Sequence, residues 1–267
     1  MKSSLRRTVL GLALGAAAAA AQAHDPFLIP STTVLSKADW ITVDAAVSND
    51  LFNFTAFPLA LDKLQVVAPD GSAVQPENLA KGKLRNVFDL NLVQPGTYRI
   101  AVLNDGVFAR WKDKASGQQK RARGTPESIA GQIPADAEEV EITQSAGRIE
   151  AFVTVGKPSA LKPSGSGLEL IAAAPTDLVK GEKAEFALQL DGRPARDVEV
   201  KVIQGDTRYR DKLDEIALRT DAQGRFAVTW PQAGLYRLEA SSKDDKTTVP
   251  RAKERRLSYA ATLEVMP

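Results

Sequence analysis

Short segments of this chain alternate between apolar and polar residues at every second position. The pattern is clearest in residues 41–47 and 98–102 in the first half, and in residues 184–190 and 198–202 in the second. Successive side chains of a β-strand point to opposite faces, so a period of two places the apolar residues on one face. We expect these segments to be strands that each bury one face in a hydrophobic core.

Turn-forming residues separate these strand patterns, among them Asp70-Gly71, Asp191-Gly192 and residues 221–224. Glycine and aspartate favour tight turns because they tolerate backbone angles that most residues avoid. No long segment has the apolar period of an amphipathic helix, and short strands at close spacing are typical of β-sandwiches. The predicted fold class is therefore all-β, with two immunoglobulin-like or transthyretin-like β-sandwich domains in tandem.

A short repeat occurs once in each half, where residues 94–100 (QPGTYRI) match residues 232–238 (QAGLYRL). Its glycine fits a tight turn, and the strand that follows directs the tyrosine to one face and the arginine to the other. A tyrosine at such a corner of a β-sandwich often forms a hydrogen bond with the backbone. The repeat therefore supports two sandwiches of similar construction.

A segment rich in proline, glycine and serine, residues 156–167 (GKPSALKPSGSG), lies near the middle of the chain. Proline stiffens the first part of such a segment, and glycine and serine loosen the second. The composition predicts a linker at residues 157–167, between an N-terminal domain at 24–156 and a C-terminal domain at 168–267.

The N-terminus has the three parts of a secretory signal peptide. Its first residues are basic, residues 9–20 are apolar or small, and residues 21–23 (Ala-Gln-Ala) match a cleavage pattern. A membrane-spanning helix needs about 20 apolar residues, and this segment is shorter. We expect residues 1–23 to be a signal peptide cleaved after Ala23, so that an exported, periplasmic protein that is not membrane-embedded starts at His24.

The mature chain is expected to be nearly neutral. The full sequence has 35 basic and 33 acidic residues, and the signal peptide contains Lys2, Arg6 and Arg7. Such a balance gives no reason to expect binding to nucleic acid. The sequence also lacks cysteine, so it has no disulfide, no thiolate nucleophile and no thiolate metal ligand.

Two basic segments, 110–123 and 243–256, follow the two repeats. Their basic residues are Arg110, Lys112, Lys114, Lys120, Arg121 and Arg123 in the first segment, and Lys243, Lys246, Arg251, Lys253, Arg255 and Arg256 in the second. Each segment is either a solvated loop or hairpin, or part of a surface that binds an anion or a partner. Trp111 is either a core residue or an aromatic ring that stacks on a planar ligand.

His24 is the single histidine of the sequence. A protease-type triad uses histidine as its base, and typical zinc sites use several His or Cys ligands, so both are disfavoured. Cleavage after Ala23 would give His24 a free amine, which forms with its imidazole a chelate suited to Cu(II) or Ni(II). We predict a metal site formed by His24 and Asp25. The alternative is that His24 is only the product of cleavage.

No other motif assigns a chemistry. The sequence has no glycine-rich nucleotide motif and no EF-hand calcium loop. We therefore expect a binding or accessory protein and not an enzyme, with no catalytic residue. Two alternatives remain, a structural or protein-interaction module that uses the basic segments and a glycan-acting hydrolase, whose paired carboxylates are set by distances in the folded chain.

The predicted mature start, residues 24–30 (HDPFLIP), resembles that of NikM-like proteins, a bacterial periplasmic family of unknown function grouped with nickel and cobalt uptake. Residues 220–226 (TDAQGRF) and 231–236 (PQAGLY) are similar to the C-terminal module of that family. The resemblance covers essentially the whole mature chain. It implies a role in the uptake or handling of nickel, cobalt or copper, a metal-uptake transporter component as a partner, and His24 as a metal ligand.

The second half is also similar to transthyretin-like and carboxypeptidase-regulatory modules, through residues 191–195 (DGRPA) and 220–226. This resemblance implies a structural and usually non-catalytic β-sandwich. The shared motifs are mainly turn sequences, so they identify a fold better than a function.

Overall fold

The computed structural model describes residues 25–210 and 213–267, and nearly all regular structure in these ranges is β-strand. Within them, helices are limited to α1 (Pro126–Ala130) and the 3-10 turn η1 (Thr207–Tyr209). The predicted all-β, sandwich-type fold is confirmed. Among the described residues, no helix combines the length and the apolar character that crossing a membrane requires.

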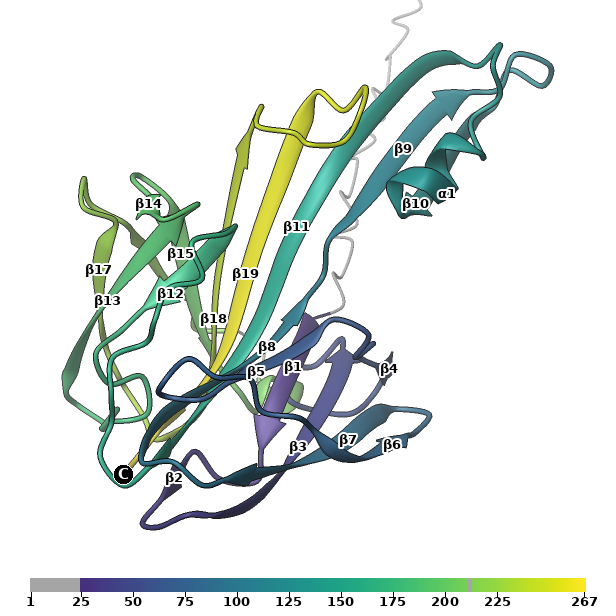
Figure 1. Cartoon of the computed structure of the whole chain (residues 1–267). Helices are drawn as coiled ribbons and strands as arrows, with labels where there is room; N and C mark the ends of the chain where they lie inside the picture. The colour runs from purple at the N-terminus through teal and green to yellow at the C-terminus, as the bar shows by residue number, and fades with distance from the viewer. Residues whose placement is uncertain (1–24, 211–212) are drawn as a thin grey trace, which may run out of the picture.

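The first sandwich packs two layers of strands face to face (Figure 1). One layer has the order β1-β3-β7-β6, with β4 beside β3, and the other contains β2, β5, β8 and the end of β11. These strands are β1 (Asp25–Pro30), β2 (Val34–Leu35), β3 (Asp39–Ser48), β4 (Phe57–Pro58), β5 (Leu64–Val67), β6 (Glu77–Lys81), β7 (Arg85–Leu92), β8 (Gly96–Leu103) and β11 (Glu138–Val155).

The core of this sandwich follows the predicted alternation. Val43 of β3 and Phe88 of β7 are fully buried against Ile100 of β8 and Val153 of β11. Each fully buried aliphatic or aromatic side chain contributes about 1.5–3 kcal/mol relative to an exposed one. The alternating segments 41–47 and 98–102 are therefore strands of one core, as the sequence predicts.

The second sandwich is built from the C-terminal strands. One sheet joins β12, β13, β14 and β17, and it faces β15, β16, β18 and β19 across a core that contains Trp230 and Tyr236. The strands are β12 (Leu168–Ile171), β13 (Lys183–Leu190), β14 (Arg193–Pro194), β15 (Glu199–Gln204), β16 (Ile216–Arg219), β17 (Arg225–Thr229), β18 (Gly234–Asp244) and β19 (Glu254–Val265). The alternating segments 184–190 and 198–202 supply Phe186, Leu188, Val200 and Val202 to this core.

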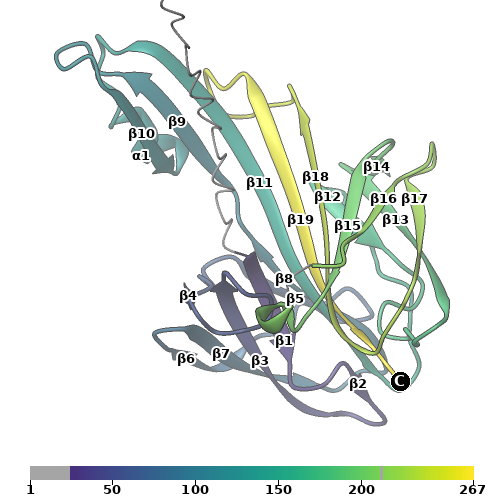
Figure 2. The same cartoon turned by 180° about the vertical axis from the view of Figure 1, so that it is seen from behind.

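Strand β11 connects the two sandwiches directly. Its 18 residues span about 60 Å. One edge of β11 pairs with β8 and β9, and the other edge pairs in parallel with β19, so that one sheet continues from the first sandwich into the second. Figure 2 shows this long sheet from behind.

The far half of β11 carries a projecting unit, which we call the arm. It consists of β9 (Gly106–Lys112), β10 (Gln119–Gly124), α1 and residues 138–145 of β11, and it stands away from both sandwiches in Figure 1. Trp111, Ile129 and Ile142 form a third hydrophobic cluster inside the arm. Trp111 is therefore a core residue, which is one of the two interpretations that the sequence leaves open.

The repeated glycine and tyrosine occupy equivalent corners. Gly96 and Gly234 have φ angles of 122° and 129°, which side chains disfavour, and strands β8 and β18 start there. The hydroxyl of Tyr98 accepts a hydrogen bond from the Gln94 N–H at 2.6 Å, and that of Tyr236 donates to the Gln232 carbonyl at 2.8 Å. The expected tyrosine corners are confirmed in both sandwiches.

Candidate functional site

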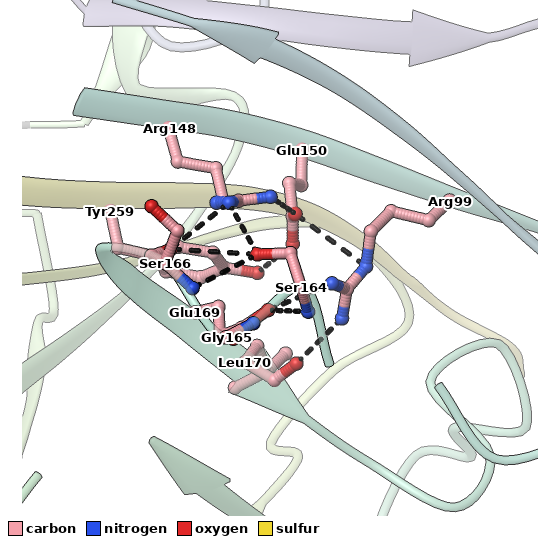
Figure 3. Close-up of polar contacts among 9 residues, drawn as sticks. All are labelled: Arg99, Arg148, Glu150, Ser164, Gly165, Ser166, Glu169, Leu170 and Tyr259. Carbon is pink, nitrogen blue, oxygen red and sulfur yellow. Dashed lines mark hydrogen bonds and ion pairs between the residues drawn. The ribbon is translucent and has the colours of Figure 1, made fainter. Parts of the chain in front are cut away.

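Four buried charged side chains meet where the first sandwich, β11 and the second sandwich come together (Figure 3). Arg99 of β8 donates to Glu169 Oε2 of β12 at 3.1 Å and to the Leu170 carbonyl at 3.0 Å. Arg148 of β11 donates to Glu150 Oε1 at 3.2 Å. Each arginine therefore contacts a carboxylate, and the four charges balance.

Hydrogen bonds complete this cluster, which with Tyr259 we call the junction network. The Tyr259 hydroxyl donates to Glu150 Oε2 at 2.7 Å, and the backbone N–H groups of Ser164 and Gly165 donate to the Glu169 carboxylate at 2.8 Å. Burial and the neighbouring Glu150 carboxylate raise the pKa of Tyr259 well above its usual value, so the hydroxyl remains a proton donor.

The junction network joins parts of the chain that are distant in sequence. Arg99 belongs to the first sandwich, Glu169 to the second, and Ser164 to the segment that the sequence predicts as a linker. Ser159 and Lys162 of that segment also bond to the first sandwich, where Ser159 N–H donates to Thr97 Oγ1 at 3.0 Å. The network therefore holds the two sandwiches and residues 157–167 together.

The two carboxylates of the network are not placed for acid–base catalysis. Glu150 and Glu169 are completely buried, and their oxygens are occupied by arginine, tyrosine and backbone donors. A catalytic carboxyl group must reach the substrate proton directly or through one water. The network therefore has the properties of a structural element.

A cavity of about 650 Å³ lies where β1 starts, and we call it the N-terminal cavity. Its volume is in the range of small-molecule sites. Residues of β15, β18 and β19 line it, and its charged lining residues are Asp25, Arg123, Arg148, Glu199, Lys201, Arg237 and Glu239. Charges of both signs therefore surround a polar space.

Arg237 of β18 fixes the start of β1 at the wall of this cavity. Its Nη1 donates to the Pro26 carbonyl at 2.7 Å, its Nη2 lies 3.4 Å from Asp25 Oδ1, and its Nε donates to Glu239 Oε2 at 2.9 Å. Strand β1 is also an edge strand whose six residues pair with β3. The first described residues are therefore held by both sandwiches.

The predicted metal ligands have different outcomes. His24 lies outside the described residues. Asp25 lies at the N-terminal cavity, where it forms an ion pair with Arg237. In the described part of the chain, no three His, Cys, Asp or Glu side chains gather closely enough to hold a metal ion.

Sequence reasoning missed the roles of Arg99 and Arg237, although both stand directly after the tyrosine of the internal repeat. Both are buried, and each links β8 or β18 to a distant segment. A repeated Tyr-Arg pair in strands that leave a sandwich core was the available signal. It would have indicated an arginine buried on the second face of each strand.

The two basic segments lie at the same end of the molecule. The first forms the β9–β10 hairpin of the arm, and the second connects β18 to β19, where Gln144 of β11 bonds to Thr248 at 2.7 Å. Several of their cations form ion pairs with acidic residues. Arg110 pairs with Glu141, and Arg255 pairs with Asp191 and Asp244. Lys114, Lys120, Arg121, Lys246, Arg251 and Lys253 are exposed.

Comparison with solved structures gives distant neighbours. Trypsin-activated alpha-2-macroglobulin from Escherichia coli is 14% identical over 92% of this chain and 16% of that chain, with a TM-score of 0.24. The Yersinia pseudotuberculosis adhesin InvE is 11% identical over 89% of this chain and 58% of that chain, with a TM-score of 0.23. The D0-D1 domain of intimin is 11% identical over 89% of this chain and 97% of that chain, with a TM-score of 0.21.

This chain therefore spans less than two thirds of the length of the first two neighbours. No curated protein matches the sequence. A family model described as a domain of unknown function, DUF4198, matches residues 21–244. Because the match extends over most of the chain, the protein belongs to the DUF4198 family.

Proposed function

We propose that this protein is an exported, periplasmic binding protein of the NikM-like type, which takes part in the uptake or handling of nickel, cobalt or copper. Its metal site is the mature N-terminus, which directly precedes strand β1, and the first residues of β1 line the N-terminal cavity. The observation that carries the proposal is the anchoring of β1, because Arg237 binds Asp25 and Pro26 at the wall of that cavity.

The proposed ligands are the free amine and the imidazole of His24. Two nitrogen donors on a free chain bind weakly, because the metal must also order the chain. Here the next residues are already ordered, since Phe27 and Leu28 are buried and β1 pairs with β3 along its length. An anchored β1 lowers this cost. Asp25 would contribute only in competition with its ion pair to Arg237, so the nitrogen donors are the primary ligands.

Calorimetric titration with Ni(II) and Cu(II) tests the site in mature protein that starts at His24. We expect His24→Ala, and separately an extension of at least four residues before His24, to abolish tight binding, because the first removes the imidazole and the second moves the free amine away from it. Asp39→Asn is the control, because Asp39 is an exposed carboxylate that does not line the N-terminal cavity, and its loss preserves both nitrogen donors and the contact of Asp25 with Arg237, so the affinity should not change. Equal binding by the mature, His24→Ala and extended proteins, or no binding by any, would end the proposal.

A second candidate function is protein interaction through the arm, and the convergence of both basic segments at one end favours it. Its partner would be a component of a metal-uptake transporter.

A photo-crosslinking residue at Phe108, an exposed aromatic position of the arm, should give an adduct in periplasm that weakens at high salt. Trp40 is a matched exposed position on the first sandwich. Equal adducts at both positions, or none at Phe108, would count against this function.

A further inference from the structure

A second, smaller cavity of about 270 Å³ lies between the first sandwich and the segment at 160–164, and we call it the junction cavity. Residues of β5, β8, the turn at 68–71 and this segment line it together with Arg148 of β11. It borders the junction network on the side of the first sandwich. Side chains that are far apart in sequence therefore face one small space.

Every charged side chain that lines the junction cavity is cationic, namely Arg99, Arg148 and Lys162. The side chains of Arg99 and Arg148 are only 7% and 8% exposed. Water screens buried charges much less than exposed ones, so these guanidinium groups act strongly on an anion nearby. The lining thus has the charge and the burial of an anion site.

These groups retain hydrogen-bond donors. The Arg99 guanidinium has five N–H donors, of which two bond to Glu169 and to the Leu170 carbonyl and the buried Nε–H faces Glu150 Oε1 at 3.6 Å, so two N–H groups of Nη1 and Nη2 remain. Lys162 Nζ donates to the Asp70 backbone carbonyl at 2.6 Å, and an ammonium group has three N–H donors. Gln65 also lines this space. A ligand that accepts several hydrogen bonds would satisfy these donors.

The charge balance calls for one negative charge. Glu150 and Glu169 form ion pairs with the two arginines, whereas the hydrogen-bond partner of Lys162 is an uncharged backbone carbonyl. The Asp70 carboxylate accepts hydrogen bonds from Ser72 and Gln94, and the described residues show no ion pair between it and Lys162, although the Lys162 charge contributes to lowering its pKa.

We propose that the junction cavity binds a small oxyanion, a carboxylate or a phosphate, between Arg99, Arg148 and Lys162. Charge-assisted hydrogen bonds to such an anion are stronger than bonds between neutral groups. The bound anion would join the first sandwich to residues 160–164 and thereby tighten the contact between the two sandwiches. This site is separate from the proposed metal site.

NMR titration of the mature protein tests the proposal with acetate, inorganic phosphate and chloride at constant ionic strength. We expect acetate or phosphate, but not chloride, to shift the amide signals of Gly71 and Ser164, and the comparison of acetate with phosphate identifies the oxyanion class. Lys162→Gln should weaken the binding about tenfold, which corresponds to about 1.4 kcal/mol. Lys162 is exposed, so this variant should fold normally.

Lys157→Gln is the matched control, because Lys157 is an exposed lysine of the same segment that does not line the cavity. It should bind the oxyanion as the unchanged protein does, and so should His24→Ala, which separates this result from the proposed metal function. Shifts no larger than those caused by chloride, or equal affinities for Lys162→Gln and the unchanged protein, would overturn the proposal.

Discussion

Arg99 and Arg237 perform similar tasks at equivalent positions of the two sandwiches. Each follows a corner tyrosine, and each lies on the face of its strand opposite to that tyrosine. Arg99 binds Glu169 of the second sandwich, and Arg237 binds Pro26 of the first. The sequence repeat predicts the corners but not these partners, because the partners are separated from the arginines by 70 and 211 positions.

The junction network predicts a large cost for a small change at Glu169. In Glu169→Gln the side chain has one acceptor and one donor group, and the donor must face Arg99 or the N–H groups of Ser164 and Gly165. Removing one partner of a buried ion pair costs about 3–5 kcal/mol, so we expect a loss of about 3 kcal/mol in the free energy of unfolding. Urea unfolding monitored by circular dichroism measures it.

Glu185→Gln is the control for this measurement. Glu185 forms an exposed ion pair with Lys183, with 78% of its side chain accessible. Exposed pairs contribute about 0–1 kcal/mol, so this variant should unfold almost as the unchanged protein does. Equal losses in the two variants would mean that the network does not stabilise the junction.

At the scale of single elements, the Asp191-Gly192 hairpin was predictable and its anchor was not. The two residues have φ angles of 51° and 72°, the left-handed values that a tight hairpin turn requires, and they join β13 to β14. The Asp191 carboxylate then accepts a hydrogen bond from Arg255 of β19 at 2.6 Å. Turn chemistry is local, whereas this contact depends on how β13 and β19 pack.

Strand β11 is the element that the alternation pattern describes least well. Ile142 packs in the arm, Val153 in the first sandwich and Phe152 in the second. A period of two identifies a buried face, but it does not say that one strand contributes to three cores, two of which lie on opposite faces of the same segment. For the same reason the sequence predicts two sandwiches and a linker, and it does not reveal the arm or the continuous sheet.

The anchoring of Asp191 and Asp244 by Arg255 predicts a dependence of stability on pH. Hydrogen bonds from Arg255 are the largest cause that lowers the pKa of both carboxyl groups below their usual values. Groups with a lowered pKa in the folded state stabilise it above the unfolded pKa of about 3.9, and this contribution is lost as the pH falls through the lower folded values. Stability from this cluster should therefore be complete at pH 6, begin to fall as the pH approaches about 4, and disappear only below the lowered folded pKa values.

Unfolding of the unchanged protein and of Arg255→Gln at pH 6 and at pH 3 checks this prediction. The difference in unfolding free energy between the two proteins should be largest at pH 6 and should shrink at pH 3. Arg219→Gln, which removes an exposed pair with Asp197, is the control. A difference for Arg255→Gln that is the same at both pH values would show that packing, and not charge, accounts for the contribution of Arg255.

At the scale of the whole molecule, the sandwiches are connected by more than residues 157–167. Strands β11 and β19 pair over nine residue positions, from Thr143 with Glu254 to Ala151 with Thr262. The buried junction network and the contact of Arg237 with β1 add further connections. Two domains joined only by a flexible segment would unfold independently, whereas domains that share a sheet should lose their structure together.

We therefore predict that a defect in the second core also destabilises the first sandwich. Leu188→Ala empties a fully buried position of the second core and should cost about 2–5 kcal/mol. Hydrogen exchange read at β3 and β7 of the first sandwich should speed up as exchange at β13 does, and calorimetry should record one transition at a lower temperature. Leu79→Ala, at a half-exposed position of β6, should change neither. If β3 and β7 keep their protection while β13 loses its own, the sandwiches are independent units and the shared sheet does not couple their folding.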